Sequence, residues 1–177
     1  ACQIIVDPDD SNTIFMVRYG GDSDSQFDWN IGFLFKSEDG GTSWSQLGPG
    51  TIEGGRPKLL MFPGGTTATR KLLITIYGKG SFISEDSGVS WTTTDTNVVA
   101  EDLVRLWSAA IHPENSSIVY MGSVWADQAD SEYSGSIYRS NNAGETWTRL
   151  DGTTVPSGQI LDLAVDASGV IYAATTS

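Results

Sequence analysis

The stretch SEDGGTSW at residues 37–44 places acids, glycines, hydroxyl side chains and a tryptophan within eight positions. Two similar stretches follow, SEDSGVSW at 84–91 and SNNAGETW at 140–147, and the shared pattern is Ser-x-Asp/Asn-x-Gly-x-Ser/Thr-Trp. The three tryptophans are 47 residues (91 − 44) and 56 residues (147 − 91) apart. A short apolar or aromatic run precedes each copy, which predicts a tight turn between two strands.

A second repeat runs out of phase with the first. Residues 4–16, 110–121 and 163–172 each contain an apolar run, a turn rich in Pro, Asp, Asn or Gly, and a β-branched or aromatic run, and residues 59–74 are a degenerate copy. Two repeating hairpins with one shared period make a four-stranded unit of roughly 50 residues, which is the blade size of a β-propeller.

The sequence therefore predicts an all-β fold, a β-propeller segment of about three and a half four-stranded antiparallel blades. The expected blades cover about residues 1–50, 56–97 and 103–152, with a half blade at 158–177. Closed propellers use roughly 4–8 blades. We therefore expect the remaining blades to come from the same longer chain or from another chain.

Composition narrows the expected partners. The net charge is −12 and only 10 residues are Lys or Arg, which argues against a nucleic-acid partner. No apolar run is long enough to span a membrane. An acidic chain fits an extracellular, secreted (or periplasmic) location. Without a His/Cys cluster or a phosphate-binding glycine loop, we expect neither a metal nor a cofactor.

The repeated turns resemble the Asp-box (BNR) repeats of sialidases, family 74 glycoside hydrolases such as xyloglucanases, Vps10/sortilin receptors and photosystem II assembly factors. The strongest resemblance is to family 74, in HPENSSIVYMGS (112–123), GSIYRSNNAGETWTRL (135–150) and LAVDASGVIYAATTS (163–177). A sialidase function fits less well, because its chemistry needs an arginine triad and the six arginines are dispersed.

In an Asp-box the acid accepts hydrogen bonds from its own turn, the glycine takes a positive φ, and the tryptophan packs between neighbouring blades. Three copies indicate a repeated structural role, because a catalytic site is usually needed once. The third copy has an amide in place of the acid, which a turn tolerates. The resemblance thus assigns structural roles to Asp39, Asp86, Asn142, Trp44, Trp91 and Trp147.

The other tryptophans, Trp29, Trp107 and Trp125, lie near carboxylates, which for Trp125 include Asp130. An aromatic ring can stack on the C–H face of a pyranose while carboxylates hold its hydroxyl groups, so these residues are candidates for binding a polysaccharide or oligosaccharide. Two long insertions, 19–30 and 123–134, follow the second strands of their blades and are expected at one face. The alternative is that these tryptophans fill the core and the acids are solvated.

Hydrolysis is left open by the sequence. Family 74 enzymes place an aspartate in an Asp-Ile-Gly-Gly stretch, and the matching position here is Asn30, which can be neither general acid nor base. Asp22, Asp28 and Asp127 are the remaining candidates for the two carboxyl groups of an inverting endo-glucanase. The resemblance implies a β-glucan such as xyloglucan as substrate or ligand. The alternative is a non-catalytic propeller that binds proteins, of the receptor or assembly-factor type.

Overall fold

The computed structural model describes residues 2–19, 32–48, 55–94, 97–98, 105–124, 135–150 and 158–176. Every regular element in these residues is a β-strand, so the chain is all-β as the sequence predicts. Within this part of the chain, no helix is long and apolar enough to cross a membrane.

The strands form three four-stranded antiparallel sheets and one hairpin. The first sheet contains β1 (Cys2–Asp7), β2 (Asp10–Tyr19), β3 (Gly32–Ser37) and β4 (Ser45–Leu47). The second contains β5 (Gly55–Met61), β6 (Leu72–Tyr77), β7 (Gly80–Ser84) and β8 (Thr92–Thr93). The third contains β9 (Leu106–Ile111), β10 (Val119–Ser123), β11 (Ile137–Ser140) and β12 (Thr148–Arg149). The last hairpin is β13 (Ile160–Val165) and β14 (Ile171–Thr175).

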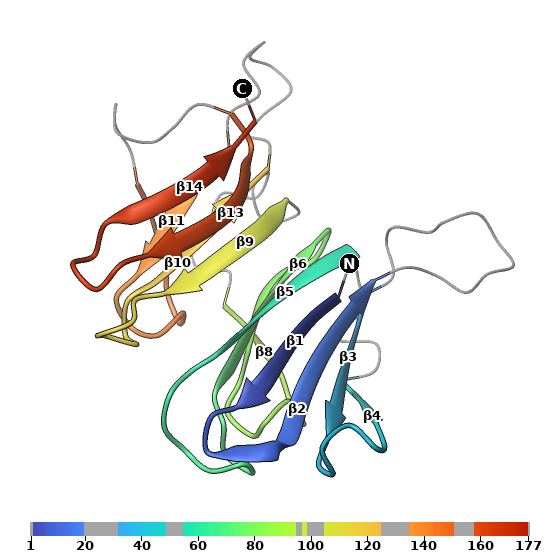
Figure 1. Cartoon of the computed structure of the whole chain (residues 1–177). Coiled ribbons are helices and arrows are strands. Elements are labelled where there is room, and N and C mark those ends of the chain that lie inside the picture. Colours follow the sequence, from blue (N-terminus) through green and yellow to red (C-terminus); the bar gives the residue numbers. More distant parts are fainter. Residues whose placement is uncertain are drawn as a thin grey trace, which may run out of the picture.

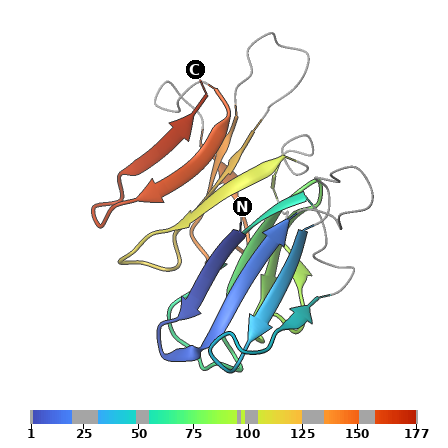
Figure 2. The same ribbon diagram turned by 45° about the vertical axis from the view of Figure 1, so that its right-hand side comes forward.

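The sheets stand side by side, as Figures 1 and 2 show from two directions. Within each sheet the strands follow chain order. The first strand of each sheet contacts the first strand of the next, β1 with β5, β5 with β9, and β9 with β13. The first strands therefore form a common inner edge, and the short strands β4, β8 and β12 lie outermost.

Each sheet has two faces, which we name by their neighbours. The trailing face packs against the sheet that follows in the chain, and the leading face packs against the sheet that precedes it. Between the first and second sheets, the trailing Phe15, Val17 and Leu34 pack against Leu59 and Leu72 of the leading face. The interface between the second and third sheets is built in the same way around Leu73, Ile83, Met121, Tyr138 and Trp147.

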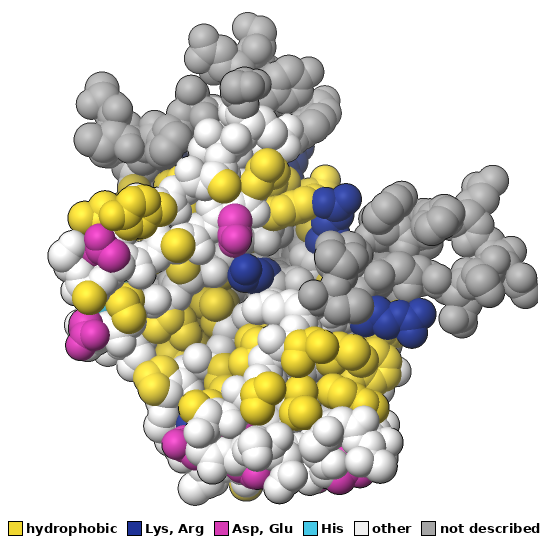
Figure 3. All heavy atoms as spheres, viewed as in Figure 1, with side chains coloured by type: hydrophobic (Ala, Val, Ile, Leu, Met, Phe, Trp, Pro, Cys, Tyr) yellow, Lys and Arg dark blue, Asp and Glu magenta, His cyan; other side chains and the backbone are white. Residues whose placement is uncertain are grey.

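Burial explains the sequence patterns of the strands. β6 reads LLITIY, a nearly continuous apolar run, because Leu72 and Ile74 face the first sheet while Leu73 faces the third. β14 reads IYAAT and alternates in burial, because only its leading face is covered by the third sheet. Hydrophobic side chains also gather over the first sheet on the face turned to the viewer in Figure 3.

Candidate functional site

The antiparallel strands give the molecule two different ends. At the turn end, short polar turns join the first strand of each sheet to the second and the third strand to the fourth, as between β1 and β2 or between β3 and β4. At the loop end β2, β6 and β10 end, β3, β7 and β11 begin, and the first strand of each sheet begins. The Ser-x-Asp/Asn stretches lie at the turn end, and the predicted ligand residue Trp107 lies at the loop end.

The first of the three repeated turns, residues 37–44, is closed by the side chains of Ser37 and Asp39. The Ser37 hydroxyl donates to Asp39 Oδ1 at 2.8 Å and accepts from the Gly41 N–H at 2.8 Å. Asp39 also accepts from Ser43, through its N–H at 2.8 Å and its hydroxyl at 2.6 Å. Both carboxylate oxygens of the acid therefore accept hydrogen bonds within its own turn.

The other two repeated turns reproduce this arrangement. Asp86 Oδ1 accepts from the hydroxyl of Ser84 and from the N–H of Ser90, each at 2.8 Å. Asn142 Oδ1 accepts from the Thr146 N–H at 3.0 Å, and its amide donates to the Thr146 hydroxyl at 2.9 Å. The amide can replace the acid because the turn needs only one acceptor oxygen from this side chain. The replacement reverses only the direction of the hydrogen bond with the hydroxyl of Thr146. The glycine of the turn has φ near +90° in every copy: Gly41, Gly88 and Gly144.

These hydrogen bonds keep the two acids ionised. Hydrogen bonds from the hydroxyl and N–H of Ser43 lower the pKa of Asp39 to about 2. Burial raises the pKa of Asp86, but hydrogen bonds from Ser90 and Ser84 outweigh it and leave the pKa below its usual value. A general acid needs a pKa near the working pH. Neither carboxylate is therefore suited to donate a proton in catalysis.

The tryptophans that end the repeated turns differ in burial although the turns match. Trp147 is 1% exposed and packs against Leu73 and Ile83 of the second sheet. Trp91 is half-buried against the first sheet, whereas Trp44 is 37% exposed. Each indole thus lies on the leading face of its sheet, and its burial depends on whether a sheet precedes it among the described residues.

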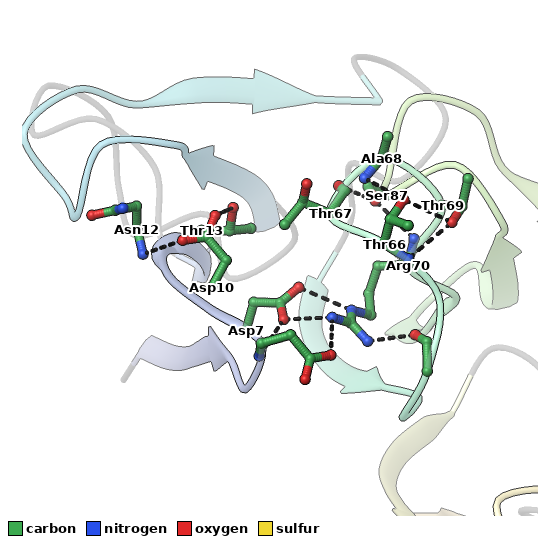
Figure 4. Close-up of polar contacts among 12 residues, drawn as sticks. Asp7, Asp10, Asn12, Thr13, Thr66, Thr67, Ala68, Thr69, Arg70 and Ser87 are labelled. Carbon is green, nitrogen blue, oxygen red and sulfur yellow. Dashed lines mark hydrogen bonds and ion pairs between the residues drawn. The ribbon is translucent and has the colours of Figure 1, made fainter.

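A buried ion pair joins the turns of the first two sheets (Figure 4). The Arg70 guanidinium donates to the Asp7 carboxylate through Nε at 2.9 Å and Nη2 at 2.5 Å, and both side chains are fully buried. Arg70 also contacts Asp9 at 2.8 Å and donates to the carbonyl of Gly64. Burial alone would raise the pKa of Asp7, but the hydrogen bonds and charge of Arg70 keep it below its usual value. The pair is a structural clamp, because every contact is internal.

The loop end holds a cluster of aromatic and cationic side chains around Trp107. Trp107 is the second residue of β9 and is half-buried. The ring of Tyr77, at the end of β6, meets the indole edge-on, with the centroids 5.8 Å apart and the planes at 88°. The Arg56 guanidinium lies over the indole, 4.1 Å from its centroid. Such a contact holds the indole in place and adds a cation beside it.

A β-bulge directs Arg56 toward Trp107. Gly55 pairs with Tyr77 and Pro57 pairs with Ile76, so Arg56 is the extra residue between them. Its φ is +43°, which is uncommon for a residue other than glycine. Bulges of this kind occur often beside functional sites, where they re-aim a side chain. The local backbone therefore places Arg56 over the indole at the cost of an unfavourable φ.

The sequence predicted only one member of this cluster. Of the predicted ligand residues the structure describes Trp107 alone, while Trp29, Trp125 and Asp130 lie outside the described residues. Asp22, Asp28, Asn30 and Asp127 lie outside them as well. Sequence analysis missed Arg56 and Tyr77. The sequence context could have indicated both residues, since Arg56 stands between Gly55 and Pro57, and Tyr77 precedes the turn Gly78-Lys79. Neither context repeats along the chain.

Two grooves lie between the outer strands of neighbouring sheets. The larger, about 480 Å³, is lined by β8 residues together with Glu85, Ser90 and Glu145. The smaller, about 260 Å³, is lined by Lys36, Glu38 and residues of the next repeated turn. Repetition of the sheets creates both grooves at matching positions. In the ranges that the structure describes, no group of three or more His, Cys, Asp or Glu side chains could hold a metal ion.

No protein-family model and no curated protein matches the sequence. Solved structures resemble the fold. The GH74 enzyme of Niastella koreensis is 16% identical with a TM-score of 0.69, and the match covers 97% of this chain and 25% of that chain. For the GH74 xyloglucanase from Xanthomonas campestris the identity is 16%, the TM-score 0.59 and the coverage 96% and 26%. For YCF48 bound to D1 peptide the identity is 18% and the TM-score 0.55, and the match covers 93% of this chain and 43% of that chain.

The chain thus spans about a quarter of the length of these GH74 enzymes. Likeness at this level of identity establishes the fold, and the fold is the one predicted from the sequence: the chain forms part of a β-propeller.

Proposed function

We propose that this chain is a polysaccharide-binding propeller segment related to family 74 glycoside hydrolases, and that its loop end holds the glycan at Trp107. The observation that carries this proposal is the cluster of Trp107, Tyr77 and Arg56. It lies at the end where the predicted long insertions 19–30 and 123–134 also begin. Under this proposal, each four-stranded sheet is one blade and the repeated turns are Asp-box turns.

The chemistry of the cluster suits a sugar. An indole offers a flat apolar surface for the C–H face of a pyranose, and an indole held by two neighbours loses little conformational freedom on binding. The Arg56 guanidinium lies over one face of the indole, so we propose that the sugar stacks on the opposite face. We propose that Trp29, Trp125 and Asp130 extend this surface, and that the ligand is a β-glucan such as xyloglucan.

The test is binding of xyloglucan oligosaccharide, measured by isothermal titration calorimetry. Trp107→Ala is expected to weaken binding at least about tenfold, which corresponds to about 1.4 kcal/mol. The matched control is Trp44→Ala, which removes a partly exposed indole at the turn end and is expected to leave affinity unchanged. Equal affinity of the wild-type chain and Trp107→Ala, or loss of binding in the control, would contradict the proposal.

Hydrolysis is a separate part of the proposal. We propose Asp22, Asp28 and Asp127 as the carboxylates to test, since Asp39 and Asp86 are held ionised within their turns. Release of reducing ends from xyloglucan is the measurement, with Asp22→Asn, Asp28→Asn and Asp127→Asn made singly. Activity that survives all three substitutions removes these residues as candidates, and binding without activity leaves the chain a non-catalytic glycan binder.

A second candidate function is protein binding. YCF48 is a propeller of similar fold whose structure holds the D1 peptide. The Arg56 guanidinium lies over Trp107, and a guanidinium can bind a peptide carboxylate in a bidentate manner. Capture of a peptide by the wild-type chain, lost in Arg56→Ala, together with no affinity for xyloglucan, would favour this function. Under either function we propose an extracellular location for the chain.

A further inference from the structure

The interface between the second and third sheets contains a group of buried hydroxyl side chains, which we call the polar layer. It lies on the loop-end side of the apolar cluster around Leu73 and Tyr138. Its members are 0% to 6% exposed: Thr75, Ser81, Thr94, Ser123 and Ser136. Burial of a hydroxyl group costs free energy unless the group forms hydrogen bonds, so such a layer calls for an explanation.

The second sheet contributes one row of the polar layer. Thr75 and Ser81 pair with each other on β6 and β7, and each lies two residues from Leu73 or Ile83, which pack against the third sheet. Residues two apart on a strand share a face, so both hydroxyl side chains point toward the third sheet. Thr94 extends the row, since its N–H bonds to the Ser81 carbonyl and its hydroxyl lies 3.0 Å from that of Ser81.

The third sheet contributes the other side of the polar layer. A side chain at Gly135 would meet Ile160 of the last hairpin, so the next residue, Ser136, points the opposite way, toward the second sheet. The Ser136 N–H donates to the Ser123 hydroxyl at 2.9 Å. Hydroxyl groups therefore enter this interface from both sheets.

The matching rows of the neighbouring sheets carry no hydroxyl group. The strands are aligned on the serine that starts each repeated turn. Where the second sheet has Thr75, Ser81 and Thr94, the first has Val17, Leu34 and Leu47, and the third has Gly122, Ile137 and Leu150. The aliphatic residues of these two rows belong to apolar clusters. Packing between sheets therefore does not require hydroxyl groups at this level of the fold.

Two hydroxyl groups of the polar layer lack a protein partner. The described residues include four buried side-chain nitrogen or oxygen atoms without a hydrogen bond, and two of them are Thr75 Oγ1 and Ser136 Oγ. Buried polar groups in folded proteins are nearly always hydrogen-bonded, either to protein or to ordered water. A buried water molecule usually bonds to about three groups that the protein leaves unsatisfied.

We propose that the polar layer is a binding site for internal water, which hydrogen-bonds to Thr75 Oγ1 and to Ser136 Oγ. Solvent has a route to the layer, because Thr94 also lines the groove of about 480 Å³ between the outer strands. At the loop end the layer borders the aromatic cluster, since Tyr77 follows Thr75 by two residues on the same face of β6 and its ring meets Trp107. The proposal does not depend on a glycan binding there.

A high-resolution crystal structure of the full chain is the direct test. It is expected to show a water oxygen within hydrogen-bonding distance of Thr75 Oγ1 and another, or the same one, beside Ser136 Oγ. A hydroxyl group without such a water would overturn the assignment at that residue.

Isosteric variants give a second test with a defined sign. Thr75→Val keeps the shape of the side chain and removes the hydroxyl. Loss of a partner for bound water is expected to lower the midpoint of thermal unfolding by about 1–4 °C, and Ser136→Ala is expected to act in the same direction. Removal of an unsatisfied buried hydroxyl would instead raise the midpoint. A raised midpoint for either variant would therefore contradict bound water at that position.

Val17→Thr is the matched control, because it adds the same hydroxyl at the corresponding position of the apolar first interface. It is expected to lower the midpoint, with no water beside the new hydroxyl in its crystal structure. Water at that position would show that any hydroxyl at this level attracts solvent, and the polar layer would then not be a specific site. The oligosaccharide titration of Trp107→Ala tests glycan binding separately.

Discussion

The turns at 37–44 and 140–147 share their backbone-to-side-chain hydrogen bonds and have different surroundings. In both, the serine hydroxyl bridges the turn and the Asp or Asn oxygen accepts from the backbone, at distances that agree within a few tenths of an ångström. Trp147 is buried under the second sheet, whereas Trp44 is 37% exposed. Local sequence therefore determines the shape of the turn, and the neighbouring sheet determines how much its tryptophan contributes to stability.

The largest expected effect is that of Trp147→Ala. Removal of this buried indole leaves a cavity between the second and third sheets, so we expect the free energy of unfolding to fall by about 3–5 kcal/mol. Trp44→Ala should cost less than about 1 kcal/mol, because its ring is already partly solvated. Urea denaturation at concentrations where the chain is monomeric measures both values. Equal losses for the two variants would contradict the inference that the neighbouring sheet determines how much each tryptophan contributes to stability.

The clamp between the first two sheets gives the next effect. Arg70→Met leaves Asp7 buried without its partner, and we expect a loss of about 3 kcal/mol in the free energy of unfolding. The double variant Asp7→Leu/Arg70→Met removes both charges and should recover most of that loss. Urea denaturation of the single and double variants gives the coupling. A double variant less stable than Arg70→Met would contradict the assignment of the cost to an unpaired charge.

The glycines of the repeated turns give a second test of whether the preceding sheet constrains the turn. Gly41 and Gly144 share a φ near +90°, so Ala strains the backbone equally at both. A methyl group at Gly144 would collide with Leu73 of the preceding sheet, whereas at Gly41 it would meet only side chains at ordinary contact distance. Gly144→Ala should therefore be less stable than Gly41→Ala by about 1–3 kcal/mol. Thermal unfolding of the pair tests this difference, and identical midpoints would show that the preceding sheet adds no constraint.

The smallest expected effect is a change in stability at acidic pH. Hydrogen bonds lower the folded-state pKa of Asp39 to about 2 from the usual 3.8. The carboxylate therefore contributes stability at pH values above about 4, and the contribution is lost as the pH falls toward 2. Asp39→Asn should be slightly less stable than the wild type at pH 7, and the difference should shrink at pH 3. Urea midpoints at both pH values measure this stability difference. Asn142→Asp introduces a carboxylate into the third turn, so it should be slightly more stable than the wild type at pH 7, and this gain should shrink at pH 3. A difference that does not depend on pH would contradict the assignment.

Repetition made the fold predictable. The Ser-x-Asp/Asn pattern and the second hairpin motif appear several times, so the strands, the four-stranded unit and the all-β class could be inferred from the sequence. The positions of the three turn glycines were predictable for the same reason, because only glycine tolerates their φ at low cost.

Features that occur once were not predictable. Arg70 pairs with Asp7 across 63 residues, and nothing local marks either as buried. Arg56 reaches Trp107 only because β5 has a bulge whose effect depends on its pairing with β6. The unequal burial of the three turn tryptophans also depends on long-range packing. Trp107 was identified as a candidate because the tryptophans of the repeated turns had been excluded. Its neighbours Arg56 and Tyr77 belong to strands that are far from it in the sequence.

Trp91 and Trp147 each belong to one sheet and cover the sheet before it, so each of these units carries the side chain needed for one of its two boundaries. Duplication of a unit within a gene would therefore supply both the new sheet and the indole that attaches it. Loss of an internal unit would leave the remaining boundaries with their tryptophans in place. Chains built in this way can change in length during evolution without simultaneous mutations elsewhere.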